Sequence, residues 1–323
     1  MSDKKKAIPT EKVVLHPKNK HRNRYDFPKL TETCPELGKY VKPTGHGDVS
    51  IDFANPKAVK WLNKALLKQY YSLEYWDIPT GYLCPPVSGR ADYIHHIAEL
   101  LGASNEGNIP IGYKIKCMDI GVGASCVYPV IGNKEYGWSF VGTDIDTEAL
   151  KSADKIISNN HFLKRNVDLR LQANPKDIFH TVMLRTEPID ITICNPPFHA
   201  SADEALQGTI KKISSLNHKK TTEPVLNFGG QSHELWCDGG EVRFVLDMIR
   251  QSKQFQANCF WFSTLISKQS HLKLITDALT HAGVAQQKLI PMAQGTKISR
   301  ILAWTFLNAA QQKKWIETRW NIL

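Results

Sequence analysis

The fold is decided by the stretch Met118-Asp119-Ile120-Gly121-Val122-Gly123-Ala124-Ser125. It continues the apolar run Ile115–Ile120, which predicts a short buried strand. Glycines after a strand let the backbone turn sharply and approach a ligand closely, and the helix that follows offers unpaired N–H groups. The stretch therefore predicts the first strand of a nucleotide-binding sheet, with Asp119, Gly121 and Gly123 at the cofactor.

A second motif, Thr143-Asp144-Ile145-Asp146, ends the next predicted strand, Trp138–Thr143. Asp144 lies 21 residues after Gly123, where a carboxylate can accept hydrogen bonds from both ribose hydroxyls. A dehydrogenase would carry much the same pair of motifs, although usually with a third glycine where this chain has Cys126. The two motifs predict a nucleoside-containing cofactor and leave its chemistry open.

A third motif, Asn195-Pro196-Pro197-Phe198, follows the predicted buried strand Ile189–Cys194. Asn-Pro also occurs at positions 55–56 and 174–175, where it fits ordinary turn or cap chemistry. The third occurrence differs because it ends a strand of a nucleotide-binding sheet, where ligands collect, and adds a second proline and an aromatic ring. We therefore expect this motif to hold the substrate.

These residue types suit one reaction, methylation of the exocyclic amine of an adenine. The side-chain oxygen of Asn195 and the backbone carbonyl of Pro196 can each accept one N–H bond, which aims the nitrogen lone pair. Phe198 offers a face for the base, and such stacking is worth about 1–3 kcal/mol. Holding amine and methyl in line can contribute roughly 7–11 kcal/mol at best. We expect no metal, and the zinc motif HExxH fails at His233-Glu234 because position 237 is Cys.

Strand-like and helix-like segments alternate from residue 112 onward, which favours a doubly wound parallel sheet. The predicted strands are Ile115–Ile120, Trp138–Thr143, Val167–Leu171, Ile189–Cys194, Cys259–Ser263, Gln287–Ile290 and Ile298–Leu307. The predicted helices between them are Glu148–Asn159, Ala202–Leu216, Glu241–Ser252 and His271–His281. The last two strands leave no room for a crossover helix and so predict an antiparallel hairpin. A mostly parallel seven-stranded α/β sheet with a C-terminal antiparallel hairpin is the class I, Rossmann-like arrangement of methyltransferases.

The motifs resemble those of a specific family. Asn195-Pro196-Pro197-Phe198 matches the (D/N/S)PP(F/Y/W) signature of amino-group methyltransferases. The run Asp119–Pro129 resembles the bacterial 23S rRNA adenine-N6 methyltransferases of the RlmF type and the eukaryotic relative that methylates U6 snRNA. Three further stretches agree with these families: Arg90-Ala91-Asp92-Tyr93-Ile94-His95, Gly239-Gly240-Glu241 and the closing hairpin with Trp304.

The resemblance implies S-adenosyl-L-methionine as cofactor and one adenosine of 23S rRNA, free or in a large-subunit assembly intermediate, as substrate. By matching positions, the cofactor would be held by Arg90, Gly121, Ser125, Asp144 and Asn195, with its adenine ring near Gln172. Asn195 and Phe198 would hold the target base. Asp144 stands where the eukaryotic relative has Glu, and either carboxylate can serve the ribose.

Other functions stay open on the sequence alone. The same chemistry could act on another RNA, on DNA or on a protein glutamine, although no separate sequence-reading module is apparent. A non-catalytic RNA-binding protein that has kept the fold is a further alternative, and the intact motifs argue against it. For Trp236 we weigh two roles equally, in a loop that closes over the base or in simple packing.

Charge and composition fit a protein that binds a polyanion. The chain has 323 residues and a net charge of +10, and residues 1–24 hold eight Lys or Arg against two acids. We assign residues 1–50 to a basic, RNA-contacting N-terminal arm and 51–323 to the Rossmann-like domain, with N-terminal helices at about 56–102. A solvated tail is the alternative for the arm. The absence of a secretory signal, of long apolar runs and of CxxC pairs predicts a cytoplasmic, non-membrane protein, and we expect a monomer.

Overall fold

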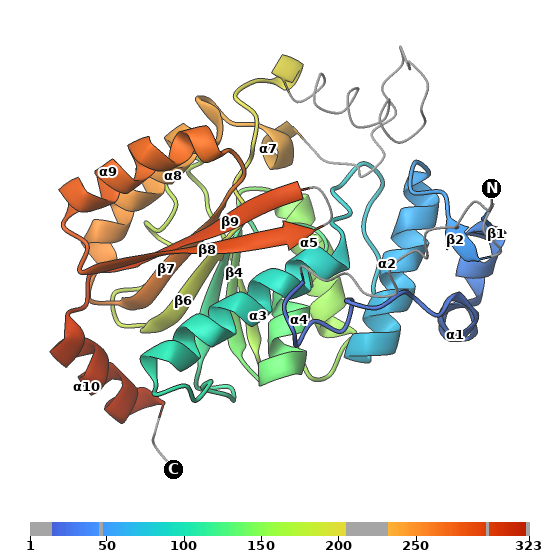
Figure 1. Cartoon of the computed structure of the whole chain (residues 1–323), viewed down its shortest axis with the longest axis horizontal. Helices are drawn as coiled ribbons and strands as arrows, with labels where there is room; N and C mark the ends of the chain where they lie inside the picture. Colours follow the sequence, from blue (N-terminus) through green and yellow to red (C-terminus); the bar gives the residue numbers. More distant parts are fainter. Residues whose placement is uncertain (1–14, 45–47, 205–231, 295–296, 321–323) are drawn as a thin grey trace, which may run out of the picture.

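The computed structural model describes residues 15–44, 48–204, 232–294 and 297–320 (Figure 1). Its centre is a seven-stranded sheet in the order β5-β4-β3-β6-β7-β9-β8. The strands are β3 (Lys116–Ile120), β4 (Ser139–Asp144), β5 (Val167–Leu171), β6 (Ile189–Cys194), β7 (Cys259–Ile266), β8 (Gln286–Gln294) and β9 (Lys297–Thr305). Neighbours from β5 to β7 are parallel, and β9 pairs antiparallel with both β7 and β8. The predicted fold class is confirmed.

The predicted strand bounds agree with the structure to within a few residues. β5 and β6 have the predicted bounds, whereas β7 runs three residues past the predicted end at Ser263. Every residue of β7 is buried, so the change from apolar to hydroxyl side chains at Ser263 and Thr264 does not mark a surface turn. Instead, Ser263 donates from its hydroxyl to the carbonyl of Thr192 on β6 at 2.5 Å.

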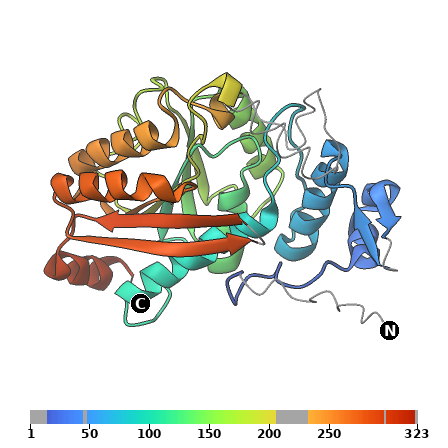
Figure 2. The ribbon, with the colours of Figure 1, turned by 45° about the horizontal axis from the view of Figure 1, so that its top comes forward.

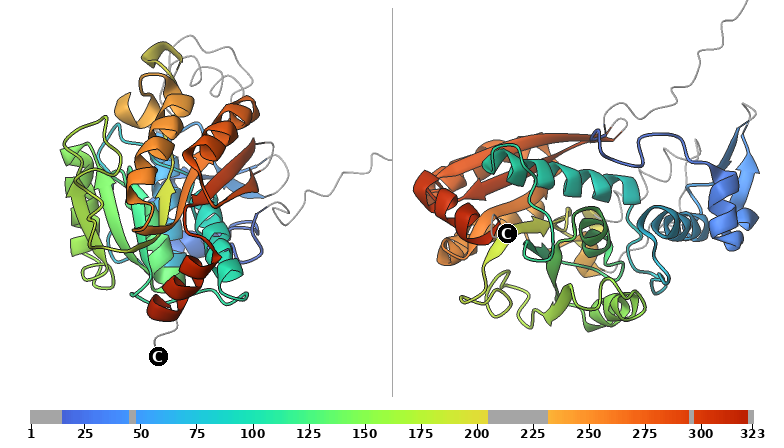
Figure 3. Two further views of the ribbon diagram at one scale, coloured as in Figure 1. Left: turned by 90° about the vertical axis from the view of Figure 1, so that its left-hand side faces the viewer. Right: turned by 90° about the horizontal axis from the view of Figure 1, so that it is seen from below.

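Helices cover both faces of the sheet (Figure 3). A larger cluster of buried side chains lies under α2 (Pro56–Tyr71), α3 (Val87–Ser104), α4 (Val127–Tyr136) and α5 (Thr147–Ser158). A smaller cluster lies under α8 (Gly240–Ser252) and α9 (Leu272–Ala282) and includes Trp304 of β9. The predicted helix Ala202–Leu216 lies outside the described residues from position 205 onward. None of the described helices is long and apolar enough to cross a membrane.

In the turn before α4, Cys126 occupies the position at which the three-glycine pattern has its third glycine. Cys126 precedes α4 and adopts the left-handed conformation, with φ of 50°. Glycine adopts this conformation at little cost, which explains why related cofactor loops place glycine there. Here the strained residue is fully buried, and burial raises the pKa of its thiol, so Cys126 is a packing residue.

The N-terminal region folds against the sheet domain and is not separate from it. It contains α1 (Phe27–Thr33), the 3₁₀ helix η1 (Pro35–Tyr40) and the hairpin of β1 (Val41–Pro43) with β2 (Val49–Ile51), which lie beside α2 at one end of the molecule (Figure 2). Leu30 and Leu37 belong to the same buried cluster as the α2 side chains. The domain boundary expected after residue 50 therefore falls inside β2.

The basic segment 15–24 is docked on α3. The backbone N–H of His16 donates to Asp92 at 2.7 Å, and the Asn19 amide donates to the carbonyl of Ser88 at 3.0 Å. Lys20 forms an ion pair with Glu135 at 2.7 Å. This part of the expected arm is thus fixed in place and not a solvated tail, while residues 1–14 lie outside the described residues. A further helix, α10 (Ala309–Arg319), follows β9 and had no counterpart in the sequence prediction.

Candidate active site

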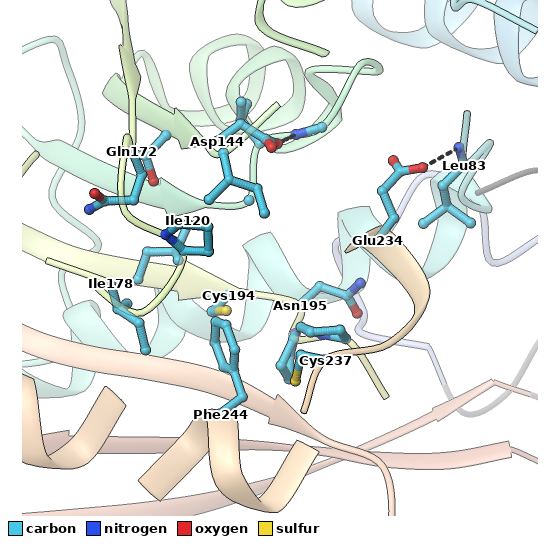
Figure 4. Close-up of a pocket in the computed structure, with 18 of the residues that line it drawn as sticks. Leu83, Ile120, Asp144, Gln172, Ile178, Cys194, Asn195, Glu234, Cys237 and Phe244 are labelled. Atoms are coloured by element: carbon cyan, nitrogen blue, oxygen red, sulfur yellow. Dashed lines mark hydrogen bonds between the residues drawn. The ribbon is translucent and has the colours of Figure 1, made fainter. Parts of the chain in front are cut away.

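A cavity of about 750 Å³ opens at the carboxyl ends of β3, β4 and β6 (Figure 4). Parallel α/β sheets bind their ligands at this edge. Nine of the eleven residues that the sequence predicted for the site line this cavity. They are Arg90, Gly121, Gly123, Ser125, Asp144, Gln172, Asn195, Pro196 and Pro197. Asp119 and Phe198 are not part of the lining.

The glycine loop and the acidic residue of β4 form one hydrogen-bonded unit. Gly121 and Gly123 have φ of 76° and 63°, in the left-handed region that favours glycine. The backbone N–H of Gly123 donates to Oδ2 of Asp144 at 2.9 Å, and that of Gly121 donates to the carbonyl of Thr143 at 2.9 Å. Asp144 is 8% exposed, so its carboxylate faces the cavity from a fixed position and can accept hydroxyl hydrogens.

Gln172 fixes the loop that forms one end of the cavity. Its side-chain amide donates to the carbonyl of His180 at 2.8 Å, and its side-chain oxygen accepts from the backbone N–H of Asn174 at 3.1 Å. Ile145 and Ile178 also line the cavity, and Ile145 is 40% exposed there. Two apolar walls beside an amide suit a purine ring. The sequence analysis missed both isoleucines, although Ile145 directly follows the acidic residue of its motif.

Asp119 lies beneath the glycine loop and not at the cavity surface. It is fully buried, and neither carboxylate oxygen has a hydrogen-bond partner within the described ranges. Burial raises the pKa of Asp119 to about 8, an effect that Arg90 opposes and Asp144 reinforces. Arg90 also lies over the ring of Tyr128, with 5.4 Å from its guanidinium carbon to the ring centroid. Asp119 therefore lies below the cavity lining, close enough to Arg90 for their charges to interact.

Asn195 is held at the end of β6 by α3. The Tyr93 hydroxyl accepts from the backbone N–H of Cys194 at 3.4 Å and lies 2.9 Å from the hydroxyl of Ser263. The side-chain oxygen of Asn195 is buried and has no hydrogen-bond partner among the described residues. A buried acceptor without a donor costs free energy, about 1–3 kcal/mol. The Asn195 oxygen is therefore positioned to accept a hydrogen bond from a ligand.

The segment after the motif pairs with a second chain segment that covers the cavity. His199 forms a parallel bridge with Trp236, donating to the carbonyl of Leu235 at 3.1 Å and accepting from the N–H of Cys237 at 3.1 Å. Gly240 has φ of 60°, and a Cβ on it would lie 3.1 Å from the backbone nitrogen of Ala200. Gly240 thus permits the close approach of this covering segment.

The aromatic lining of the cavity differs from the expectation. Phe198 is partly buried outside the lining, whereas Tyr128, Trp236 and Phe244 line the cavity. Figure 4 shows Phe244 beside Cys194, Asn195 and Cys237. Trp236 is half-buried, so of its two possible roles the one at the cavity fits its position. Phe244 lies one helical turn after Gly240, and only a contact between distant segments brings it to the site.

Comparison with known proteins gives a consistent result. The sequence profile of a family described as RNA methyltransferase matches residues 10–308. The ribosomal RNA large subunit methyltransferase F of Cytophaga hutchinsonii is 56% identical over 317 residues, which cover 98% of each chain. The protein of the same name from Yersinia enterocolitica is 52% identical over 98% of this chain and 95% of its own.

Solved structures agree with the sequence relatives. The catalytic domain of hMettl16 in complex with the MAT2A 3'UTR hairpin 1 superposes with a TM-score of 0.76 at 28% identity, covering 91% of this chain and 96% of that one. The N-terminal domain of human METTL16 in complex with SAH gives a TM-score of 0.72 at 25% identity, covering 91% and 99%.

Proposed function

The chain belongs to the RNA methyltransferase family, and we propose that it methylates the N6 amine of one adenosine in the 23S rRNA of the large ribosomal subunit. S-adenosylmethionine is the methyl donor. The observation that carries the choice of an amine is the buried oxygen of Asn195 at the carboxyl end of β6, which has no partner among the described residues. The names of the relatives support the choice of RNA.

The lining of the cavity fits this cofactor chemically. Asp144 provides a carboxylate for the ribose hydroxyls, and the apolar walls at Ile145 and Ile178 suit the adenine ring. Arg90 provides a guanidinium for the carboxylate of the amino-acid part. At Gly121, a Cβ built on the backbone would have no atom within 4 Å, which leaves open space for a ligand against the loop.

When bound, the cofactor supplies a methyl group on a positively charged sulfur. The task of the chain is then to hold the adenine amine in line with that methyl group. In the proposal, Asn195 and the carbonyl of Pro196 each accept one of the two amine hydrogens. The nitrogen lone pair is thereby directed away from the ring and toward the methyl carbon. The methylated amine then releases one proton to solvent, because an amide oxygen and a peptide carbonyl are too weakly basic to keep it.

The target base is proposed to lie in the part of the cavity next to Asn195. Phe244 lies there in Figure 4, and Trp236 also lines the cavity, so both offer apolar faces. Phe198 follows Pro197 directly and is proposed to contact the base or its neighbour from outside the lining. Aromatic contacts of this kind are worth about 1–3 kcal/mol per base.

The docked basic segment is proposed to contact the phosphates of the RNA. Lys18, Lys20 and Arg24 are exposed, and the fixed backbone of the segment presents them in a defined arrangement. Lysine and arginine contacts with phosphates release counterions, so binding weakens as salt rises. A monomer acting in the cytoplasm on free 23S rRNA or on an assembly intermediate is the simplest setting for this function.

Labelled S-adenosylmethionine tests the substrate. Unmodified 23S rRNA, large subunits lacking the modification and duplex DNA would be offered in parallel, and the label in each polymer counted. Label in the rRNA or in the subunits supports the proposal and distinguishes free from assembled substrate. Label in DNA alone would overturn the proposed substrate and keep the chemistry.

A further inference from the structure

We infer that Glu234 binds the ammonium group of the amino-acid part of S-adenosylmethionine, opposite Arg90, which binds the carboxylate. The inference rests on the cofactor named in the proposed function and is independent of the RNA substrate. It adds a binding residue from the segment that covers the cavity, outside the three motifs that the sequence singled out.

Glu234 lies on α7 (Ser232–Leu235), and its side chain lines the cavity. Oε2 accepts a hydrogen bond from the backbone N–H of Leu83 at 3.1 Å. Oε1 lies next to the glycine loop, because a Cβ built on Gly123 would be only 3.8 Å from it. The carboxylate therefore sits between the glycine loop and the connection that precedes α3.

This position lies at the end of the cavity where the amino-acid part belongs. In Figure 4, Glu234 and Leu83 lie on the opposite side of the cavity from Gln172, with Asp144 between the two sides. If the adenine ring lies near Gln172 and the ribose at Asp144, the remaining part of the cofactor extends toward Glu234. Arg90 lines the same cavity and lies near the start of α3, after the connection that Glu234 contacts.

The charges of the site match those of the ligand part. The amino-acid part carries one ammonium and one carboxylate. Glu234 offers a negative charge for the ammonium, and Arg90 offers a positive charge for the carboxylate. Among the other charged side chains of the lining, Asp247 forms ion pairs with Arg243 at 2.8 Å and with Arg250 at 3.1 Å. An ammonium hydrogen-bonded to a carboxylate gains roughly twice as much as a neutral pair. Loss of the Glu234 charge should weaken cofactor binding by about 10- to 100-fold.

The test is calorimetric binding, without RNA, to the wild-type protein and to Glu234→Gln. Glutamine keeps an oxygen that can accept the hydrogen bond of Leu83 while it removes the charge. The ligands are S-adenosylmethionine, S-adenosylhomocysteine and 5'-methylthioadenosine, which has no amino-acid part. Asp154→Asn is the control, because it removes an exposed carboxylate that is not part of the cavity lining.

We expect Glu234→Gln to weaken binding of S-adenosylmethionine and S-adenosylhomocysteine equally, by about 10- to 100-fold, and to leave 5'-methylthioadenosine within about twofold. Asp154→Asn should leave all three affinities within about twofold. An equal loss for all three ligands would make Glu234 a structural tether and overturn the inference. A loss confined to S-adenosylmethionine would place the carboxylate at the sulfonium, and no loss at all would exclude a binding role; either result also overturns it. Wild-type protein that binds none of the ligands would instead refute the proposed cofactor.

Discussion

The two halves of the cavity differ in how their polar groups are satisfied. In the cofactor half, formed by Gly121, Gly123, Asp144 and Gln172, the side chains are bonded to the chain itself, as in the contacts of Asp144 with the N–H groups of Gly123 and Asp146. In the base half, formed by Asn195, Pro196, Pro197, Trp236 and Phe244, the Asn195 oxygen has no partner within the described part of the chain. The cofactor half is thus preorganised, and we propose that the base half is completed by its substrate.

The largest effect that separates the halves is expected at Asn195. Asn195→Ala should lower single-turnover methyl transfer by about 100- to 1000-fold, the range found when one preorganised hydrogen-bonding group is lost from an active site. The affinity for S-adenosylmethionine should change by less than about threefold, because the cofactor half is intact. Rapid-quench assays at saturating cofactor, with calorimetric binding, measure both quantities. A loss of cofactor affinity as large as the loss of rate would contradict the assignment of Asn195 to the base half.

A change in the cofactor half should give the reverse pattern. Asp144→Ala removes the acceptor of the Gly123 and Asp146 N–H groups as well as the proposed ribose ligand. We expect cofactor affinity to fall by about 100-fold, together with a loss of about 1–3 kcal/mol in the free energy of unfolding. Asp144→Glu is the matched control and should retain most of the affinity. An unchanged free energy of unfolding in Asp144→Ala would contradict the claim that this half is held by its own hydrogen bonds.

The sequence predicted the cofactor half better than the base half for a physical reason. The glycine loop and Asp144 are local signals, since each directly follows a strand and its spacing is fixed by the strand and helix between them. Phe244 of the base half reaches the cavity only because His199 pairs with Trp236 and Gly240 lies against Ala200, and the same contacts bring in Glu234, which we assign to the cofactor. Such contacts join distant segments and leave no periodic pattern in either segment.

The N-terminal region was predicted as an arm separate from the domain, and the structure differs for a similar reason. Its high charge favoured a separate arm, but the buried contacts of His16 and Asn19 with α3 decide where the segment lies. Their partner Asp92 is part of the Arg90–His95 stretch, which the sequence analysis linked only to a family resemblance. The closing hairpin was predictable, because connection length alone separates parallel from antiparallel neighbours.

The pH dependence of stability tests the buried carboxyl group of Asp119, which lies beneath the glycine loop of the cofactor half. Because the pKa of Asp119 is raised to about 8 in the folded chain, above its unfolded value, folding binds a proton that the unfolded chain releases. The cost of an ionised Asp119 is absent below about pH 4 and grows as pH rises to about 8. The free energy of unfolding of Asp119→Asn, relative to that of the wild type, should therefore rise by at least about 1 kcal/mol between pH 4 and pH 8. Urea unfolding at both pH values, without cofactor, measures the difference in the free energy of unfolding between variant and wild type. The same difference at both pH values would contradict the raised pKa of Asp119.

The smallest effect is expected for the docked basic segment, which belongs to neither half. Replacing Lys18, Lys20 and Arg24 by Gln should weaken RNA binding and reduce the slope of log affinity against log salt by about one for each phosphate that is no longer neutralised. Cofactor affinity should stay within about twofold, since these exposed side chains are not part of the cavity lining. Filter binding over a series of salt concentrations measures the slope. The same slope in variant and wild type would leave this segment without a role in RNA binding.

The most direct test concerns the atom that receives the methyl group. Asn195 and the carbonyl of Pro196 are proposed to accept the two hydrogens of an exocyclic amine, a geometry that neither a ring nitrogen, a ring carbon nor a ribose hydroxyl can satisfy. Unmodified 23S rRNA should be methylated in vitro with the purified chain, digested to nucleosides and analysed by mass spectrometry against synthetic standards. The proposed geometry predicts N6-methyladenosine as the product. A methyl group on a ring atom or on the ribose would contradict it.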